Sequence, residues 1–60
     1  MDKKMEFEIG VSYLVDLEEI YYVTVLDFSP SGKFVHVHEE DDDDKFWFSN
    51  NPKVILEKLE

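Results

Sequence analysis

The fold is decided by residues 21–35, which read YYVTVLDFSPSGKFV. Two runs rich in valine and aromatic residues flank the segment SPSGK, in which a proline and a glycine are typical of a tight turn. Proline presets φ for the first turn position, and Gly32 accepts the left-handed conformation that closes a three-residue hairpin loop. These residues predict a β-hairpin with strands over about residues 20–29 and 33–39, in which Ser29 lies opposite Lys33.

This register sorts the hairpin side chains into two faces, because cross-strand partners share a face. The expected pairs are Val25 with Val37, Thr24 with His38, Leu26 with His36 and Phe28 with Phe34. One face has small branched side chains and is expected to form core: Val23, Val25, Val35 and Val37. The opposite face mixes aromatic, polar and imidazole side chains and is expected to be partly exposed: Tyr22, Thr24, Leu26, Phe28, Phe34, His36 and His38.

Upstream of the hairpin, apolar residues occupy every odd position from Phe7 to Leu17. A period of two over this length is typical of a half-buried strand and not of a helix. Gly10 lies within the run and marks a bend or a bulge. We therefore expect a first strand over residues 7–17, with a polar turn at residues 16–19.

Downstream of the hairpin, the six consecutive acidic residues 39–44 predict a loop, because their charges repel one another and they have low strand propensity. The next four residues, KFWF, are expected to form a short strand. Pairing of Glu40 with Lys45 would place both phenylalanines of this strand in the core and Trp47 beside His38. A slip of one residue would reverse the two faces.

The C-terminal residues allow two interpretations. Asn51 followed by Pro52 is typical of a helix start, whereas the alternation in the segment VILEKL gives an equally good short strand. We favour a single helical turn near residues 51–54, followed by a strand that ends at Leu59.

The composition narrows the class of protein. The 60 residues include 15 Asp and Glu against 6 Lys and no Arg, which gives a net charge of −9, and 43% of the residues are hydrophobic. This hydrophobic share supports a folded domain, whereas binding to nucleic acid or to an anionic membrane needs cations. The absence of cysteine excludes disulfides and thiol chemistry. Since no transmembrane segment or signal peptide is recognised, we expect a cytoplasmic protein.

The segment from Tyr21 to Val35, together with Phe46-Trp47-Phe48 and Val54–Leu59, resembles the small SH3-like barrels of the Tudor and KOW type. The similarity covers residues 21–60 and is greatest to tiny SH3-like proteins of phages and prokaryotes. It implies an all-β fold, a five-stranded SH3-like small barrel with a short helical turn before the last strand, as one domain over residues 1–60. It also implies a non-enzymatic binding module. The KOW glycine pattern is incomplete and the basic surface is missing, so only the protein-binding side of the family carries over.

Two sets of residues are candidates for partner binding. The first is aromatic and imidazole, and comprises Tyr22, Phe28, Phe34, His36, His38 and Trp47. The second is the acidic loop, which comprises Glu39, Glu40, Asp41, Asp42, Asp43 and Asp44 and would attract a basic partner. In the structural alternative, the rings close a second small core and the acidic loop is a solvated connection.

Metal binding and catalysis have weak or no support. His36 and His38 point to the same side of a strand and could hold a divalent metal with a neighbouring glutamate, but Glu39 is expected on the opposite face. We therefore expect no metal site and no cofactor. The serines have no evident base, and no apolar pocket that would raise a carboxyl pKa can be recognised, so no enzymatic activity is expected.

The sequence favours a small acidic protein-interaction module, accessory or regulatory, that docks a basic protein partner through its aromatic sheet face or an open edge, with the acidic loop steering the encounter. The alternative is a nucleic-acid mimic that inhibits a basic DNA-binding protein. A third hypothesis is a structural or assembly subunit that completes its core as a homo-oligomer.

Overall fold

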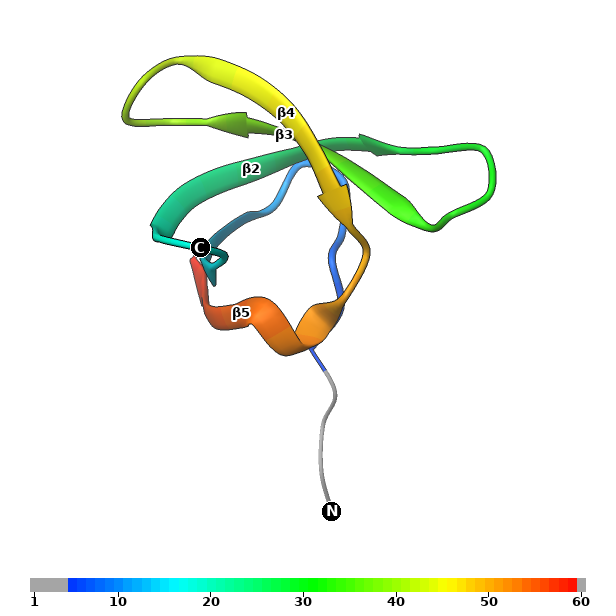
Figure 1. Cartoon of the computed structure of the whole chain (residues 1–60), viewed down its shortest axis with the longest axis horizontal. Coiled ribbons are helices and arrows are strands. Elements are labelled where there is room, and N and C mark those ends of the chain that lie inside the picture. Colours follow the sequence, from blue (N-terminus) through cyan, green and yellow to red (C-terminus); the bar gives the residue numbers. More distant parts are fainter. Residues whose placement is uncertain (1–4, 60) are drawn as a thin grey trace.

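The computed structural model describes residues 5–59, in which one strongly curved antiparallel sheet contains five strands in the order β4-β3-β2-β1-β5 (Figure 1). The elements follow the chain as β1 Ser12–Asp16, β2 Ile20–Phe28, β3 Phe34–Glu39, β4 Asp44–Ser49, the 3-10 turn η1 Pro52–Val54 and β5 Ile55–Leu59. The all-β class, the five strands and the helical turn before the last strand are confirmed. The sheet is not closed into a barrel, because β4 and β5 are its two edges. Residues 1–4 and 60 of the expected domain lie outside the described residues.

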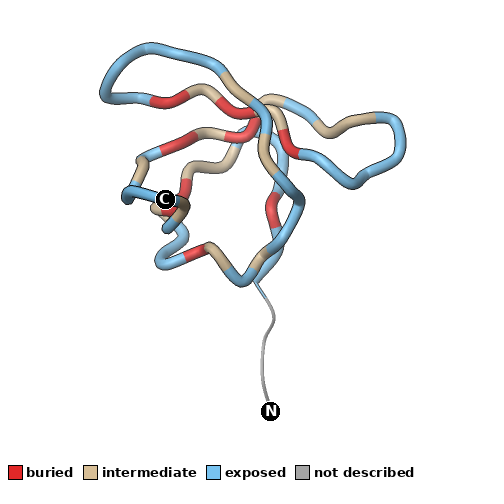
Figure 2. Tube along the Cα trace, viewed as in Figure 1, coloured by how far each residue is buried: buried red, intermediate tan, exposed pale blue. Residues whose placement is uncertain are grey.

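One side of the sheet, the inner side, forms the hydrophobic core (Figure 2). The four valines predicted for the core, Val23, Val25, Val35 and Val37, are each at most 1% exposed. The remaining buried core residues come from the other segments: Phe7, Tyr13, Val15 and Ile55. The opposite side of the sheet, the outer side, carries the polar and exposed aromatic residues.

The first strand is shorter than the predicted span of residues 7–17. Gly10 has a φ of 86° in a turn, and this turn separates Phe7, which is buried, from β1. Period two holds within β1 but fails at Ile9, which is 63% exposed. The Tyr13 hydroxyl fixes the upstream segment, since it donates to the Glu6 carbonyl at 2.9 Å and accepts from the backbone amide of residue 8 at 2.8 Å.

The β2–β3 hairpin has a loop one residue longer than predicted. The Ser29 amide donates to the Phe34 carbonyl at 2.9 Å, so Ser29 lies opposite Phe34 and not opposite Lys33. A register shift between Val25 and Asp27 compensates for the extra residue. The pairs Val25 with Val37 and Thr24 with His38 are therefore confirmed.

The same shift makes two predicted pairs wrong. Leu26 is the extra residue, so His36 pairs with Asp27, and Phe28 pairs with Val35. Because cross-strand partners share a face, Phe28 lies on the inner side and packs against the core. A bulge of this kind reverses the faces of all residues between it and the loop.

The register of β3 with β4 also differs from the prediction. Asp43 adopts a φ of 56° in a turn over residues 40–43, so that Asp44 already belongs to β4 and pairs with Glu39. Trp47 consequently pairs with His36 and not with His38. The shift preserves the faces, so both phenylalanines of β4 face the inner side as predicted: Phe46 contacts Tyr21, and Phe48 contacts Phe7.

The C-terminal prediction is confirmed, and the helical alternative for residues 55–59 is wrong. The Asn51 side chain accepts from the Lys53 amide at 3.1 Å and caps η1. The following strand, β5, pairs with β1. Within residues 5–59, no helix has the length and apolar character needed to cross a membrane.

Candidate functional site

Three of the predicted binding residues, Phe34, His36 and Trp47, lie together on the outer side of β3 and β4; we call them the aromatic face. The His36 and Trp47 rings are stacked, with centroids 4.4 Å apart and planes 9° from parallel. Trp47 is 50% exposed and Phe34 is 48% exposed. The stack holds the indole in place while it leaves half of its surface open to a partner.

Three predicted members of this set lie elsewhere: Phe28, Tyr22 and His38, which contacts the turn after β3 as described below. Phe28 is on the inner side for the reason given above. Tyr22 is on the outer side and exposed, but it belongs to β2, which is two strands away from β4, and it pairs with Leu14 of β1. The aromatic residues predicted to share one patch are therefore divided among three places.

His38 holds the turn that follows β3. The residues Glu40–Asp44 form what we call the acidic hairpin. The His38 Nδ1 lies 3.1 Å from Glu40 Oε2, and its Nε2 lies 2.5 Å from Asp43 Oδ1. A neutral imidazole has only one N–H, so it cannot donate to both carboxylates at once. The hydrogen bonds with Asp43 and then Glu40 raise the pKa of His38 and favour the imidazolium.

The carboxylates of this cluster are stabilised in their charged forms. The Thr24 hydroxyl donates to Glu40 Oε2 at 2.6 Å, and this hydrogen bond, followed by the one with His38, lowers the pKa of Glu40. The hydrogen bond with His38 lowers the pKa of Asp43. Thr24 also hydrogen-bonds to the Ser12 hydroxyl at 2.7 Å. Side chains of β1, β2 and β3 therefore fix the acidic hairpin to the sheet.

Glu39 does not belong to the exposed acidic loop in which it was predicted. It is the last residue of β3, faces the inner side opposite Val23, and is 4% exposed. Its Oε2 accepts from the Asp41 amide at 3.2 Å. Burial, followed by the charge of Asp42, raises the pKa of Glu39. The expectation that Glu39 points away from the histidine side of β3 is confirmed.

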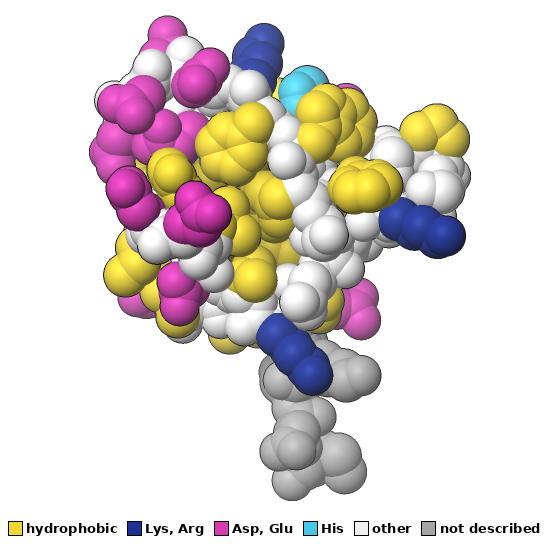
Figure 3. Space-filling view, viewed as in Figure 1, with side chains coloured by type: hydrophobic (Ala, Val, Ile, Leu, Met, Phe, Trp, Pro, Cys, Tyr) yellow, Lys and Arg dark blue, Asp and Glu magenta, His cyan; other side chains and the backbone are white. Residues whose placement is uncertain are grey.

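A small apolar hollow of about 230 Å³ opens beside the acidic hairpin, lined by Leu17, Glu18, Tyr21 and Phe46. The phenol of Tyr21 lies among carboxylates, and its pKa is raised. The largest cause is the charge of Glu19, followed by burial and then by the charges of Glu18, Glu39 and Asp42. In Figure 3, acidic side chains gather over the β1–β2 and β3–β4 turns, next to hydrophobic ones.

Sequence reasoning missed this hollow because it depends on how closely the β1–β2 turn approaches Phe46 of β4, which is far away in the chain. No pattern among neighbouring residues indicates it.

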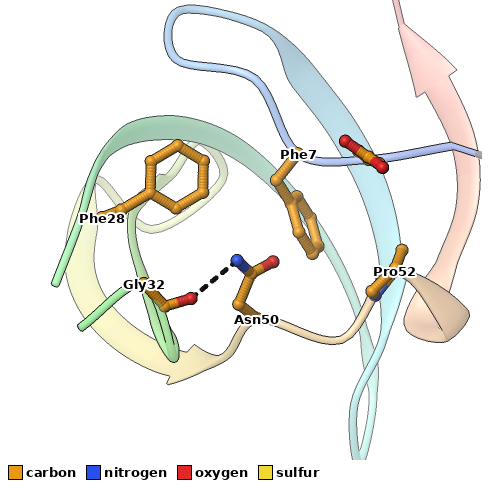
Figure 4. A pocket seen from close by; sticks show the side chains of 6 residues that line it. Phe7, Phe28, Gly32, Asn50 and Pro52 are labelled. Atoms are coloured by element: carbon orange, nitrogen blue, oxygen red, sulfur yellow. Dashed lines mark hydrogen bonds between the residues drawn. The ribbon is translucent and has the colours of Figure 1, made fainter.

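A larger hollow of about 510 Å³ lies between Phe7 and Phe28, with Glu6, Gly32, Asn50 and Pro52 completing its lining (Figure 4). The Asn50 side chain closes one wall by donating to the Gly32 carbonyl at 2.9 Å. The sequence could not predict this hollow, because the bulge at Leu26 is what turns Phe28 toward Phe7. Only one charged residue, Glu6, contributes to it.

Within residues 5–59, no group of three histidine or acidic side chains is arranged to hold a metal ion. No buried side-chain polar atom of this part of the chain lacks a hydrogen-bond partner. No protein-family model, curated protein or solved structure matches the chain. Inference about function therefore begins from the geometry of the aromatic face and the acidic hairpin.

Proposed function

We propose that this protein is a small interaction module that binds a basic segment of a partner protein through its aromatic face, with the acidic hairpin steering the encounter. The observation that carries the proposal is the half-exposed, stacked Trp47 on β4, the strand that begins at the acidic hairpin, whose carboxylates Glu40 and Asp43 are held in place by His38. The proposal includes no catalytic step.

The placement of Trp47 supports a binding role. A tryptophan that is half exposed contributes little to the core of a small domain, and tryptophan is among the residues that most often dominate binding energy at interfaces. Stacking on His36 restricts the indole before any partner arrives, which reduces the side-chain entropy lost on binding. Phe34, on the same side of β3, adds apolar area beside it.

The charge distribution supports a basic partner. The net charge of −9 repels acidic proteins and attracts basic ones over a distance of about one Debye length, ~8 Å at physiological salt. The acids are concentrated at two turns, whereas a nucleic-acid mimic would need them spread along a stripe. The sequence resemblance to SH3-like barrels, whose members include non-enzymatic protein-binding modules, agrees with this proposal.

The single tryptophan of the chain supplies the test. Titration of the protein with a lysine-rich peptide should change the fluorescence of Trp47, and an acidic peptide of equal length should not. Trp47→Ala should weaken binding of the lysine-rich peptide, measured by calorimetry, by at least about thirtyfold. The matched control is Tyr22→Ala, which removes an exposed ring from the same side of the sheet at a position two strands from β4.

Equal affinity for the basic and acidic peptides would contradict the proposal. So would an equal loss of affinity in Trp47→Ala and Tyr22→Ala, because it would mean that no particular ring is the anchor.

A further inference from the structure

The strand that carries Trp47 is an edge of the sheet. Strand β4 has β3 on one side and no strand hydrogen-bonded to its other side within the described residues. Its pairing with β3 is regular over all six residues, without a bulge. Such an edge presents backbone groups to which another strand can pair.

The hydrogen bonds at the end of the ladder show which groups point outward. The Asn50 amide donates to the Lys33 carbonyl at 2.8 Å, so Lys33 and Asn50 are a hydrogen-bonded pair. Hydrogen-bonded and non-hydrogen-bonded pairs alternate along an antiparallel ladder. The backbone groups of Lys45, Trp47 and Ser49 consequently point away from β3.

Some of these outward groups already have local partners. The Lys45 amide donates to its neighbour's carboxylate, Asp44 Oδ1, at 3.0 Å, and the Ser49 carbonyl accepts from the Asn51 amide at 2.8 Å. The amide and carbonyl of Trp47, the Lys45 carbonyl and the Ser49 amide have no hydrogen bond to the described part of the chain. The free groups are thus centred on Trp47.

We propose that the basic segment docks as an extended strand along this free edge of β4, hydrogen-bonded to the backbone of Trp47, so that the sheet gains a strand. The inference rests on the proposed function and specifies how the partner is held. In an antiparallel arrangement, the docked residue opposite Trp47 exchanges two hydrogen bonds with it and places its own side chain on the outer side, next to the indole.

Charge decides the occupant of the edge. A second copy of this chain would bring two molecules of net charge −9 together, with an acidic hairpin at the end of each β4 strand. A cationic segment instead meets the acidic hairpin with opposite charge.

The other edge of the sheet is less suitable. The pairing of β5 with β1 has a register shift between Leu14 and Val15. Lys58 of β5 is engaged with Glu8, with its Nζ 3.3 Å from Glu8 Oε2. The stacked Trp47 and the acidic hairpin adjoin β4 and not β5.

The test uses a peptide of alternating lysine and valine and two analogues with the same charge and side chains. One analogue is N-methylated at the lysine amides and the other at the valine amides. A strand uses every second amide to pair with a given edge, so methylation of one set should weaken binding at least about tenfold while the other changes it by about twofold or less. The fluorescence of Trp47 and calorimetry report the affinities.

The outcomes separate the two proposals. If both analogues bind as tightly as the parent peptide, strand pairing is overturned and the proposed function stands. The same holds if both analogues lose affinity equally, because every-second-amide dependence is then absent. If the unmethylated peptide does not bind, both proposals fall.

A protein variant provides a second, independent test. Ser49→Pro removes an outward amide and places a ring on the edge, at a position where proline is tolerated because β3 does not use that amide. It should bind the lysine–valine peptide at least about tenfold more weakly while its thermal melt is little changed. Undiminished affinity in the folded variant would overturn the proposal, and if the variant does not fold, the methylated peptides decide. If the parent protein sediments as a dimer and Ser49→Pro sediments as a monomer, the occupant of the edge is a second copy of the chain, and the proposal of a basic segment is overturned.

Discussion

The two hairpins that share strand β3 have turns of equal length but different chemistry. The first loop, residues 30–33, is closed by the hydrogen-bonded pair of Ser29 with Phe34, and the second turn, residues 40–43, is closed by the pair of Glu39 with Asp44. The first contains proline and a glycine at a φ of 78°, with amides satisfied by the hydroxyls of Ser29 and Ser31. The second contains only acids, places Asp43 at a φ of 56°, and depends on His38 and Thr24.

The comparison separates a structural turn from a candidate functional one. Residues of the first loop adopt their conformation through intrinsic preferences that depend little on pH or salt. The acidic hairpin is held by charge-assisted contacts in spite of the repulsion among its own carboxylates. A dense negative charge at a fixed position is unfavourable for a turn but suited to steering a basic partner.

The largest expected effect concerns β4, which contributes Phe48 to the core side of the sheet and Trp47 to the binding side. Phe48→Ala should destabilise the fold by about 3 kcal/mol. This value is at the lower end for removal of a phenylalanine ring, because Phe48 is only partly buried. A loss of this size should unfold a large fraction of the molecules of so small a domain. Trp47→Ala should cost about 1 kcal/mol or less, because the indole is half exposed. Thermal melts of both variants provide the measurement. A larger loss in Trp47→Ala would mean that the faces of β4 are reversed.

The next effect concerns the first loop. Gly32→Val should destabilise the protein by ~1 kcal/mol or more, because a branched residue is strained at positive φ. A Cβ at this position would meet no heavy atom within 4 Å, so the loss reflects backbone strain and not a clash. Gly32→Asn is the matched control and should lose less, because asparagine tolerates the left-handed region. Equal urea midpoints for parent and Gly32→Val would show that the loop does not need this conformation.

The third effect is a pH dependence confined to the acidic hairpin. The raised pKa of His38 means that its contribution to stability is complete below its ordinary value of 6.5 and is lost as the pH rises through the raised pKa. The lowered pKa values of Glu40 and Asp43 mean that their contributions are present above the ordinary values of 4.5 and 3.8 and are lost as the pH falls. The hairpin should therefore be most firmly held between pH 4.5 and 6.5.

Amide hydrogen exchange of residues 40–43 against pH tests this expectation. His38→Gln should remove most of the loss of protection above pH 6.5, whereas His36→Gln, which changes the other histidine of the same strand, should retain it. The same pH profile in both variants would exclude His38 as the group that holds the turn.

The smallest effect comes from the buried acid next to the turn. Burial raises the pKa of Glu39, so its ionisation at neutral pH opposes folding. Glu39→Gln should therefore raise the melting temperature at pH 7. The gain should disappear below pH 4.5, the ordinary pKa of the group, where the glutamate is neutral in both states. A lower melting temperature at pH 7 would show that the charged form has compensating contacts.

Local patterns predicted most of the architecture but not the details of register. The alternation of valines identified the core, and Pro30 with Gly32 located the first loop, because these signals depend only on neighbouring residues. The loop length depends on how the Ser29 and Ser31 hydroxyls bond to nearby amides, and the bulge at Leu26 compensates for it. Neither has a pattern in the sequence, so Phe28 was assigned to the wrong face.

The candidate site was predictable to the extent that it follows one strand. Phe34 and His36 share a face by period two, and Trp47 joined them once the phenylalanines of β4 were assigned to the core. Its stacking on His36 instead of His38 depends on Asp43 taking a left-handed conformation, which is uncommon outside glycine. The hollow at Tyr21 requires the β1–β2 turn to lie close to Phe46 of β4, a contact that no local pattern predicts.

The most direct test of the central claim is the association rate of a lysine-rich peptide, followed by stopped-flow fluorescence of Trp47 at increasing salt. The double variant Asp41→Asn/Asp42→Asn removes charge from the acidic hairpin but leaves the carboxylates that bond to His38 in place. Its control, Asp16→Asn/Glu57→Gln, removes the same charge from β1 and β5.

The account predicts that the parent rate falls steeply with salt and that the hairpin variant associates at least roughly threefold more slowly than the control at low salt. Rates that are independent of salt and equal in the two variants would contradict it.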